Sequence, residues 1–199
     1  MIFCNWITEI RDGNISNIVY TGIDIDWEHN ETIEDITKTG YRLPSSNEWE
    51  YTARYRGTDT INTVSSYNNP CFTTGRSASG ATTYYDDNSD GAGEPGKTAS
   101  EAVSVYKYYW NADIATYIDK GTPDESIVKS LGTGSANSLG LYDMSGNVYE
   151  WCFTKYNSER RIRRGGSWDD YAGPCGSPGN DIANNRSGDV GFRLCRTAN

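Results

Sequence analysis

Apolar residues recur at helical spacing in the first ten positions of the chain, where five of them fall on one helix face. These residues are Ile2, Phe3, Trp6, Ile7 and Ile10. The pattern predicts an amphipathic helix over residues 1–10, ended by the sequence Asp12-Gly13-Asn14. The apolar run 18–20 that follows predicts a short strand.

A second helix is predicted over residues 46–55. Ser45 followed by Glu48 has the spacing of a capping box, in which each side chain satisfies an amide at the start of the helix. Trp49 falls on the face that this helix should bury. We therefore assign Glu48, Trp49 and the later Trp151 to the core rather than to a binding site.

The middle of the chain has a different character. Residues 58–137 are rich in Gly, Ser, Thr, Asn, Asp and Tyr, with only isolated strand candidates such as 103–109. Such a composition predicts long irregular loops, which compact domains seldom carry without a binding role or a local stabilising ion.

The last third of the chain contains three apolar and aromatic runs separated by glycine-containing turns. The runs at 139–153, 161–168 and 190–196 predict a small antiparallel sheet, and a polar loop of 22 residues, 169–190, separates the last two. Early helices followed by late strands indicate a single α+β domain over residues 1–199.

The composition of the chain argues against several classes of function. The mean hydropathy is −0.71 and no apolar run approaches the roughly 20 residues that span a bilayer, so no membrane contact is expected from this segment. A net charge of −9 opposes binding to nucleic acid. The basic run Arg160, Arg161, Arg163 and Arg164 should place its side chains on both faces of a strand, in solvated or core-capping positions.

Few residues suit common catalytic or metal centres. The five cysteines are Cys4, Cys71, Cys152, Cys175 and Cys195, without a CxxC pair, and His29 is the only histidine. The cysteines lack the spacing of a zinc site, and a mechanism that needs a catalytic histidine has only this one position to use.

Four segments occur in a characteristic order, and they carry a resemblance to a known family. They are 41–51 (YRLPSSNEWEY), 139–151 (LGLYDMSGNVYEW), 164–168 (RGGSW) and 191–193 (GFR). Together they resemble the signature of the formylglycine-generating-enzyme family, also called sulfatase-modifying factors. The resemblance implies a C-type-lectin-like fold with two helices, a small antiparallel sheet and long irregular loops.

The enzymes of that family oxidise a cysteine of sulfatases with Cu(I) held by two cysteine thiolates. In this chain the first of those positions is Asp170 and the second is Cys175. A carboxylate is a poor ligand for Cu(I), so the resemblance implies a member without catalysis. The alternative is a copper oxidoreductase of the formylglycine-generating type that acts on a cysteine peptide.

The chain also resembles the variable proteins of diversity-generating retroelements in spirochaete-type bacteria. In those proteins AAC codons are mutagenised to NNC codons, which cannot encode Lys, Glu, Gln, Met or Trp. The loop 169–190 contains none of these five residue types, whereas about three would be expected from the rest of the chain. An ordinary polar turn region, which is also poor in large residues, is the alternative.

The resemblance implies that this loop binds a ligand, with Tyr171 as its aromatic anchor. The ligand is an unknown protein or cell-surface molecule, and the aspartates of the loop favour a basic or hydroxyl-rich partner. We expect display on a bacterial cell surface or secretion, through an upstream leader or lipid anchor. The predicted ligand-binding positions are Asp169, Asp170, Tyr171, Gly173, Pro174, Gly176, Asn180, Asp181, Asn184, Asn185, Ser187, Gly188 and Asp189.

No cofactor is required for this function, but the family implies a calcium ion at the turn before residue 151. The corresponding positions are Asp143, Gly146, Val148 and Glu150. Calcium takes six to eight oxygen ligands, which a carboxylate and turn carbonyls supply. The alternative is a hairpin turn in which Glu150 pairs with a nearby arginine. A calcium-dependent lectin is a weaker interpretation, because the sequence has no sugar-binding motif of the Glu-Pro-Asn type.

Overall fold

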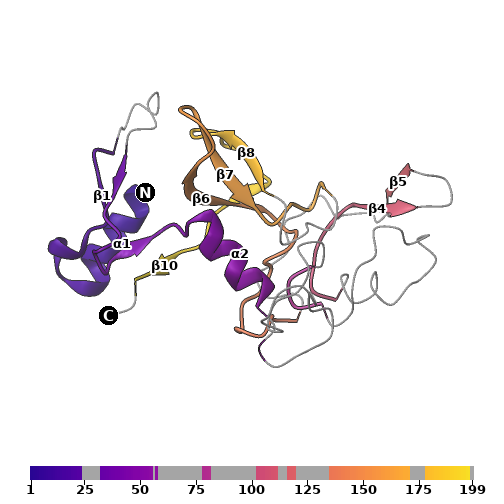
Figure 1. Cartoon of the computed structure of the whole chain (residues 1–199), viewed down its shortest axis with the longest axis horizontal. Helices are drawn as coiled ribbons and strands as arrows, with labels where there is room; N and C mark the ends of the chain where they lie inside the picture. The colour runs from indigo at the N-terminus through magenta and orange to yellow at the C-terminus, as the bar shows by residue number, and fades with distance from the viewer. Residues whose placement is uncertain are drawn as a thin grey trace.

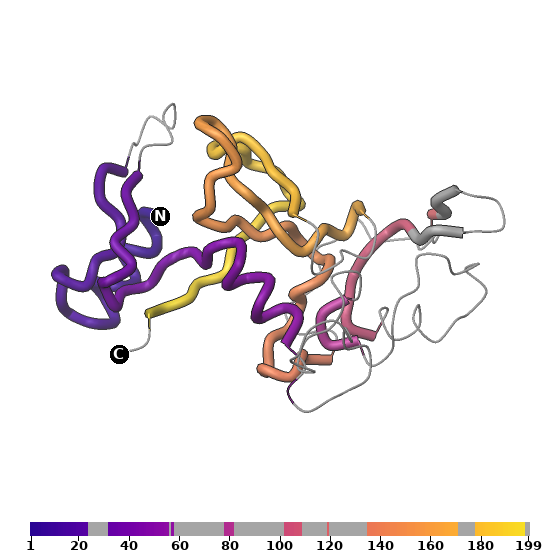
Figure 2. The backbone as a smooth tube through the Cα atoms, viewed as in Figure 1, coloured from indigo at the N-terminus to yellow at the C-terminus, as the bar shows by residue number. Residues whose placement is uncertain are grey.

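The computed structural model describes residues 1–23, 32–55, 57, 78–81, 102–111, 116–119, 135–170 and 178–197 (Figures 1 and 2). Its helices are α1 (Ile2–Asp12) and α2 (Ser46–Arg54), with a short 3-10 helix at Ile15–Asn17. The strands are β1 (Tyr20–Thr21), β2 (Ile33–Glu34), β3 (Tyr41–Arg42), β4 (Tyr108–Asn111), β5 (Thr116–Asp119), β6 (Tyr149–Lys155), β7 (Arg160–Arg164), β8 (Gly179–Ile182), β9 (Val190–Gly191) and β10 (Cys195–Arg196). None of the helices in these ranges is long and apolar enough to cross a membrane.

The largest sheet has four strands in the order β8-β7-β6-β9, and it lies beside α2 in the middle of Figure 1. Its pairings are antiparallel except between β6 and β9, which run parallel. Three two-stranded sheets pair β1 with β2, β3 with β10, and β4 with β5. The α+β class is confirmed, while the expectation of a wholly antiparallel sheet is wrong at β9.

Strand β8 lies inside the segment predicted to be a single polar loop. It covers the outer edge of β7, with Arg160 opposite Ile182 and Arg163 opposite Gly179. The sequence Gly-Asn-Asp-Ile has weak strand propensity, so its pattern gives no signal. This strand forms because its backbone makes hydrogen bonds with the edge of β7, which would otherwise be exposed.

The predicted strand over residues 139–153 begins only at Tyr149. Asp143 and Asn147 have left-handed φ angles of 54° and 63°, which an extended strand does not contain. Gly146 approaches Val105 so closely that a Cβ would overlap its carbonyl oxygen. Residues before Tyr149 therefore form a compact turn that packs on the segment preceding β4.

Helix α1 forms as predicted, but the face with its large apolar residues is exposed. Trp6 is 52% exposed and Ile10 is 56% exposed, whereas Cys4 and Thr8 are buried. Thr8 Oγ1 donates to the Cys4 carbonyl and accepts from the Tyr41 amide, both at 2.8 Å. The chain before β3 runs so close to α1 that only small side chains fit between them, and this contact decides which face is buried.

Helix α2 begins with the capping box that the sequence predicts, but the assignment of Glu48 to the core is wrong because its side chain is exposed. The Glu48 amide donates to Ser45 Oγ at 3.2 Å, and the Ser45 amide donates to Glu48 Oε2 at 2.8 Å. Trp49 and Ala53 are buried in a core cluster with Met144 and Cys152. The helix therefore fixes one side of the four-stranded sheet.

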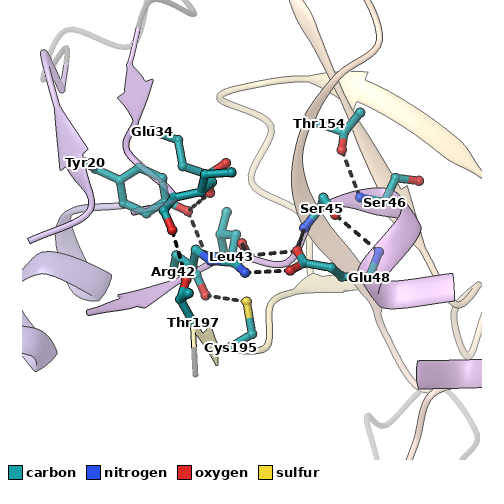
Figure 3. Close-up of polar contacts among 11 residues, drawn as sticks. Tyr20, Glu34, Arg42, Leu43, Ser45, Ser46, Glu48, Thr154, Cys195 and Thr197 are labelled. Carbon is teal, nitrogen blue, oxygen red and sulfur yellow. Dashed lines mark hydrogen bonds and ion pairs between the residues drawn. The ribbon is translucent and has the colours of Figure 1, made fainter. Parts of the chain in front are cut away.

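The start of α2 is also tied to β3 by an ion pair (Figure 3). Arg42 donates to both carboxylate oxygens of Glu48, at 2.8 and 2.5 Å. The Leu43 amide donates to the Tyr20 hydroxyl at 2.8 Å, and the Ser46 amide donates to Thr154 Oγ1 at 2.8 Å. The hydrogen bonds from Arg42 lower the pKa of Glu48 from 4.5 to about 2.

Replacing the buried indole tests the placement of α2. Trp49→Ala should lower the free energy of unfolding by about 3 to 5 kcal/mol, because it leaves a cavity in the core. The matched control Trp6→Ala removes an exposed indole and should change it by no more than about 0.5 kcal/mol. Urea denaturation measures both, and equal losses in the two variants would contradict the burial of Trp49.

The depressed pKa of Glu48 predicts an acid-sensitive contribution to stability. The contribution is fully present above pH 4.5 and is lost as the pH falls toward about 2, because the unfolded chain takes up this proton first. In Glu48→Gln the free energy of unfolding should therefore fall less steeply over this range. Urea denaturation at a series of pH values gives the two slopes, and identical slopes would refute the ion pair.

Candidate functional site

The carboxylate of Glu150, on β6, is the centre of a buried polar cluster. It accepts from the Trp49 indole Nε1 at 2.6 Å and from Nε and Nη2 of Arg193, each at 2.5 Å. Arg193 Nη2 also donates to the Tyr142 carbonyl at 3.1 Å. Only 6% of Glu150 is exposed, so this pairing provides the charge partner that a buried carboxylate needs.

This geometry bears on the predicted calcium site. The guanidinium of Arg193 contacts both the Glu150 carboxylate and the carbonyls of the turn, so a calcium ion there would face a fixed positive charge. Within the described ranges no group of three His, Cys, Asp or Glu side chains is arranged to hold a metal. The Glu150–arginine pair named as the alternative is observed, and calcium at Asp143, Gly146, Val148 and Glu150 stays a prediction.

The predicted ligand-binding segment is held at both ends by Tyr149, the first residue of β6. The Tyr149 hydroxyl is hydrogen-bonded to Asp170 Oδ2, and the Tyr149 amide donates to the Asp189 carbonyl at 2.7 Å. Burial, and after it the contact with Asp170, raises the pKa of Tyr149, so the phenol stays protonated and acts as the donor. One residue therefore brings the start and the end of the segment together.

Asp170 is fixed by its backbone as well. Its carbonyl accepts from the amides of Lys107 and Tyr108 at 2.8 and 3.1 Å, and its own amide donates to Ser167. The neighbouring Asp169 forms an exposed ion pair with Lys107 at 3.0 Å. Asp170 thus occupies the first of the two copper-ligand positions with a carboxylate that already has a partner.

Two further predicted positions lie in β8, where they contact β7. Asp181 forms an ion pair with Arg163 at 3.4 Å and accepts from Asn185 Nδ2 at 2.7 Å. Asn180 Oδ1 accepts from Arg160 at 3.1 Å. These side chains therefore have partners within the protein, so the aspartates make the surface less acidic than the sequence indicates.

The remaining predicted positions divide into two groups. Asn184, Ser187 and Gly188 are exposed, and Asn184 and Asn185 also line a cavity of about 250 Å³. Sequence reasoning did not find this cavity, because its walls come from distant parts of the chain. Tyr171, Gly173, Pro174, Gly176 and the second copper-ligand position, Cys175, lie outside the described residues.

Trp151, predicted to be a core residue, packs against the cluster of Cys4, Val19, Tyr20 and Leu43 but stays half-buried. It contributes to the wall of the same cavity. Among the described cysteines, burial raises the pKa of Cys152 and of Cys195 to about 12. Burial therefore disfavours the thiolate, which is the form that reacts as a nucleophile.

Comparison with known proteins places the whole chain in one family. The sequence profile of the sulfatase-modifying factor enzyme 1-like domain matches residues 1–198. The chaperone protein LppX of Paenibacillus barcinonensis is 32% identical over 166 residues, which are 79% of this chain and 50% of that protein. This chain therefore spans half the length of that curated relative.

Two solved structures share the fold. Treponema denticola variable protein 1 superposes with a TM-score of 0.62 at 24% identity, over 98% of this chain and 67% of the other. The crystal structure of CarF superposes with a TM-score of 0.63 at 21% identity, over 100% of this chain and 64% of the other. The likeness confirms the predicted C-type-lectin-like fold of the formylglycine-generating-enzyme type.

Replacing Arg193 in the Glu150 cluster should destabilise the folded protein. Arg193→Met leaves a buried carboxylate without its cation, and we expect a loss of about 3 to 5 kcal/mol of stability. Adding Glu150→Gln to that variant should restore much of the loss, because the uncompensated charge is removed. The matched control Arg196→Met, which breaks an exposed pair with Asp12, should cost about 1 kcal/mol or less.

Thermal unfolding with calcium and with a chelator completes this test. A bound ion stabilises the folded state by mass action, so a calcium site would raise the Tm. We expect the same Tm in both conditions. A higher Tm in calcium that disappears in Glu150→Gln would establish the metal site.

Proposed function

The chain belongs to the family of sulfatase-modifying factor enzyme 1-like domains, and we propose that it is a ligand-binding member without catalytic activity. The observation that carries this proposal is that Tyr149 holds Asp170 through its hydroxyl and Asp189 through its amide, near the two ends of the predicted segment 169–189. A segment fixed at its two ends by one scaffold residue can change its contents without changing the scaffold.

The burial of residues in the segment agrees with the proposal that the segment can change without changing the scaffold. None of the described residues 178–190 is buried, although Asp181 is half-buried and pairs with Arg163. The flanking residues are different, because Ser167 is buried and the Trp168 amide donates to the Asn147 carbonyl at 2.8 Å. Substitutions between the two flanks should therefore have small effects on folding.

The absence of catalysis is proposed from Asp170. A Cu(I) centre of the family type needs two thiolates, and a carboxylate bound by Tyr149 supplies neither the soft ligand nor a free coordination position. The name of the curated relative is that of a chaperone, a role based on binding other proteins, and it agrees with this proposal.

The finer part of the proposal is that a diversity-generating retroelement diversifies residues 169–190 to vary the specificity of binding. Its support is the lack of Lys, Glu, Gln, Met and Trp over residues 169–190. The likeness to the Treponema variable protein establishes the fold, and variability of this chain is inferred from its own sequence. Display on a bacterial cell surface, with an unknown protein or cell-surface ligand, belongs to the same proposal.

Exchange of residues 171–188 tests the binding role. Several unrelated segments of equal length, with Asp170 and Asp189 retained, should leave the Tm nearly unchanged, because the described residues exchanged contribute no buried side chain. A display library randomised over 171–188 should yield binders to a fixed target such as lysozyme. A control library randomised at the exposed turn 156–159 should yield none.

Two outcomes would overturn this proposal. One is collapse of the fold with most exchanged segments, which would make the segment structural. The other is formation of an aldehyde when the protein is incubated with Cu(I) and a Cys-x-Pro-x-Arg peptide, which would establish the oxidoreductase alternative.

A further inference from the structure

A small cavity lies where the start of α1 meets β6 and the end of the proposed binding segment. Its walls include the aromatic residues Phe3, Trp151 and Phe192, and Asn184 and Asn185 contribute from the binding segment. Its volume is about 250 Å³. Pockets for drug-sized molecules occupy roughly 300 to 1,000 Å³, so the size of this cavity suits one side chain of a larger ligand.

The aromatic walls are held in place by contacts within the protein. The Phe3 ring packs edge-on against Phe192 at 5.7 Å and against Trp6 at 5.6 Å, and Trp151 packs against the core cluster described above. Phe3 and Phe192 nevertheless stay 42% and 51% exposed. A group of exposed rings around a cavity is typical of a surface that binds a partner.

The charges at the cavity restrict the chemistry of that partner. The described residues of its lining include Arg161 and Arg186 and no acidic residue, which disfavours a cationic side chain. The Arg161 guanidinium lies 4.0 Å from the centre of the Phe153 ring and donates to the Phe153 carbonyl, and its other two nitrogens are buried. Arg161 therefore offers the cavity no hydrogen-bond donor, and the aromatic walls favour a neutral, apolar side chain.

Asn184 supplies a polar group at the same cavity. It is exposed, and its side-chain amide has no hydrogen bond to any residue that the structure describes. The neighbouring Asn185 differs, because its Nδ2 donates to Asp181. A side-chain amide carries both donors and an acceptor, so Asn184 can bond to the N–H and C=O groups of a peptide.

We propose that this cavity binds an aromatic side chain of a protein ligand, packed against Phe3, Trp151 and Phe192, and that Asn184 binds the peptide group beside it. The proposal rests on the binding role above and names the chemistry of one part of the ligand. Edge-on and offset contacts between rings favour an aromatic over an aliphatic group. A single aromatic residue enclosed in a pocket is the kind of contact that dominates binding between proteins.

The first experiment uses the unaltered protein. Binding of N-acetylphenylalaninamide and of N-acetylalaninamide, which has the same peptide groups without the ring, is measured by NMR chemical-shift titration. We expect the phenylalanine derivative to bind at least about tenfold more tightly, with shifts at the Trp151 indole, because only its ring reaches the aromatic walls. Equal affinities, or no binding of the phenylalanine derivative, would overturn the proposal.

The second experiment assigns the walls. Phe192→Ala should reduce the preference for the phenylalanine derivative at least about fivefold. The matched control Tyr156→Ala removes an exposed ring outside the cavity and should retain the preference. A second variant, Ala183→Phe, fills the cavity from the binding segment and should abolish binding of the phenylalanine derivative. Unchanged binding in either folded variant would contradict the proposal.

The third experiment assigns the peptide group. Toluene has the ring without a peptide group, so Asn184→Ala should leave its affinity unchanged but weaken N-acetylphenylalaninamide at least about threefold. An equal loss for both probes, or no loss for either, would remove the role of Asn184. Tighter binding of toluene than of the phenylalanine derivative to the unaltered protein would identify a hydrocarbon ligand and contradict the assignment to a protein.

The two proposals can fail separately. If lysozyme binders come from the library over 171–188 but the phenylalanine and alanine derivatives bind equally, the cavity proposal is wrong and the binding role stands. If the phenylalanine derivative is preferred but exchanged segments destroy the fold, the cavity binds an aromatic side chain in a protein whose segment 171–188 is structural.

Discussion

The buried carboxylate of Glu150 determines how the distant parts of this chain meet. It needs partners because water is excluded, and Trp49 from α2 and Arg193 from the segment after β9 provide them. A second pair, Arg164 with Glu50, joins β7 to α2 at 2.9 Å. These contacts connect all four sequence segments that carry the family resemblance. The carboxylate of Glu150, which could indicate a metal site, therefore holds distant segments of the fold together through its contacts.

The position of Glu150 also fixes the start of β6, to which the proposed binding segment is attached. Tyr149 lies next to Glu150 and holds Asp170 through its side chain and Asp189 through its backbone. Asp170 and Asp189 thus flank the proposed variable residues, and β8 among them pairs with β7. In the proposed function, this attachment is the physical basis on which one scaffold can present different residues.

The distribution of charge shows why net charge is a poor guide to the ligand. The chain carries −9, which on its own favours a basic partner. However, Asp169 pairs with Lys107 and Asp181 pairs with Arg163 within the protein. The local environment of each charge, rather than their sum, decides which ligand chemistry a site favours.

The sequence by itself determined the features that depend on neighbours along the chain. The Ser45–Glu48 capping box, the burial of Trp49 and the four ordered motifs of the fold followed from residue types at short spacing. Tertiary structure decided the exposed face of α1, the presence of β8 and the arginine on Glu150. These depend on contacts between residues far apart in sequence: 101 positions separate Trp49 from Glu150 and 43 separate Glu150 from Arg193. A hydrophobic pattern shows that a face can be buried, but only packing against a specific neighbour decides whether it is.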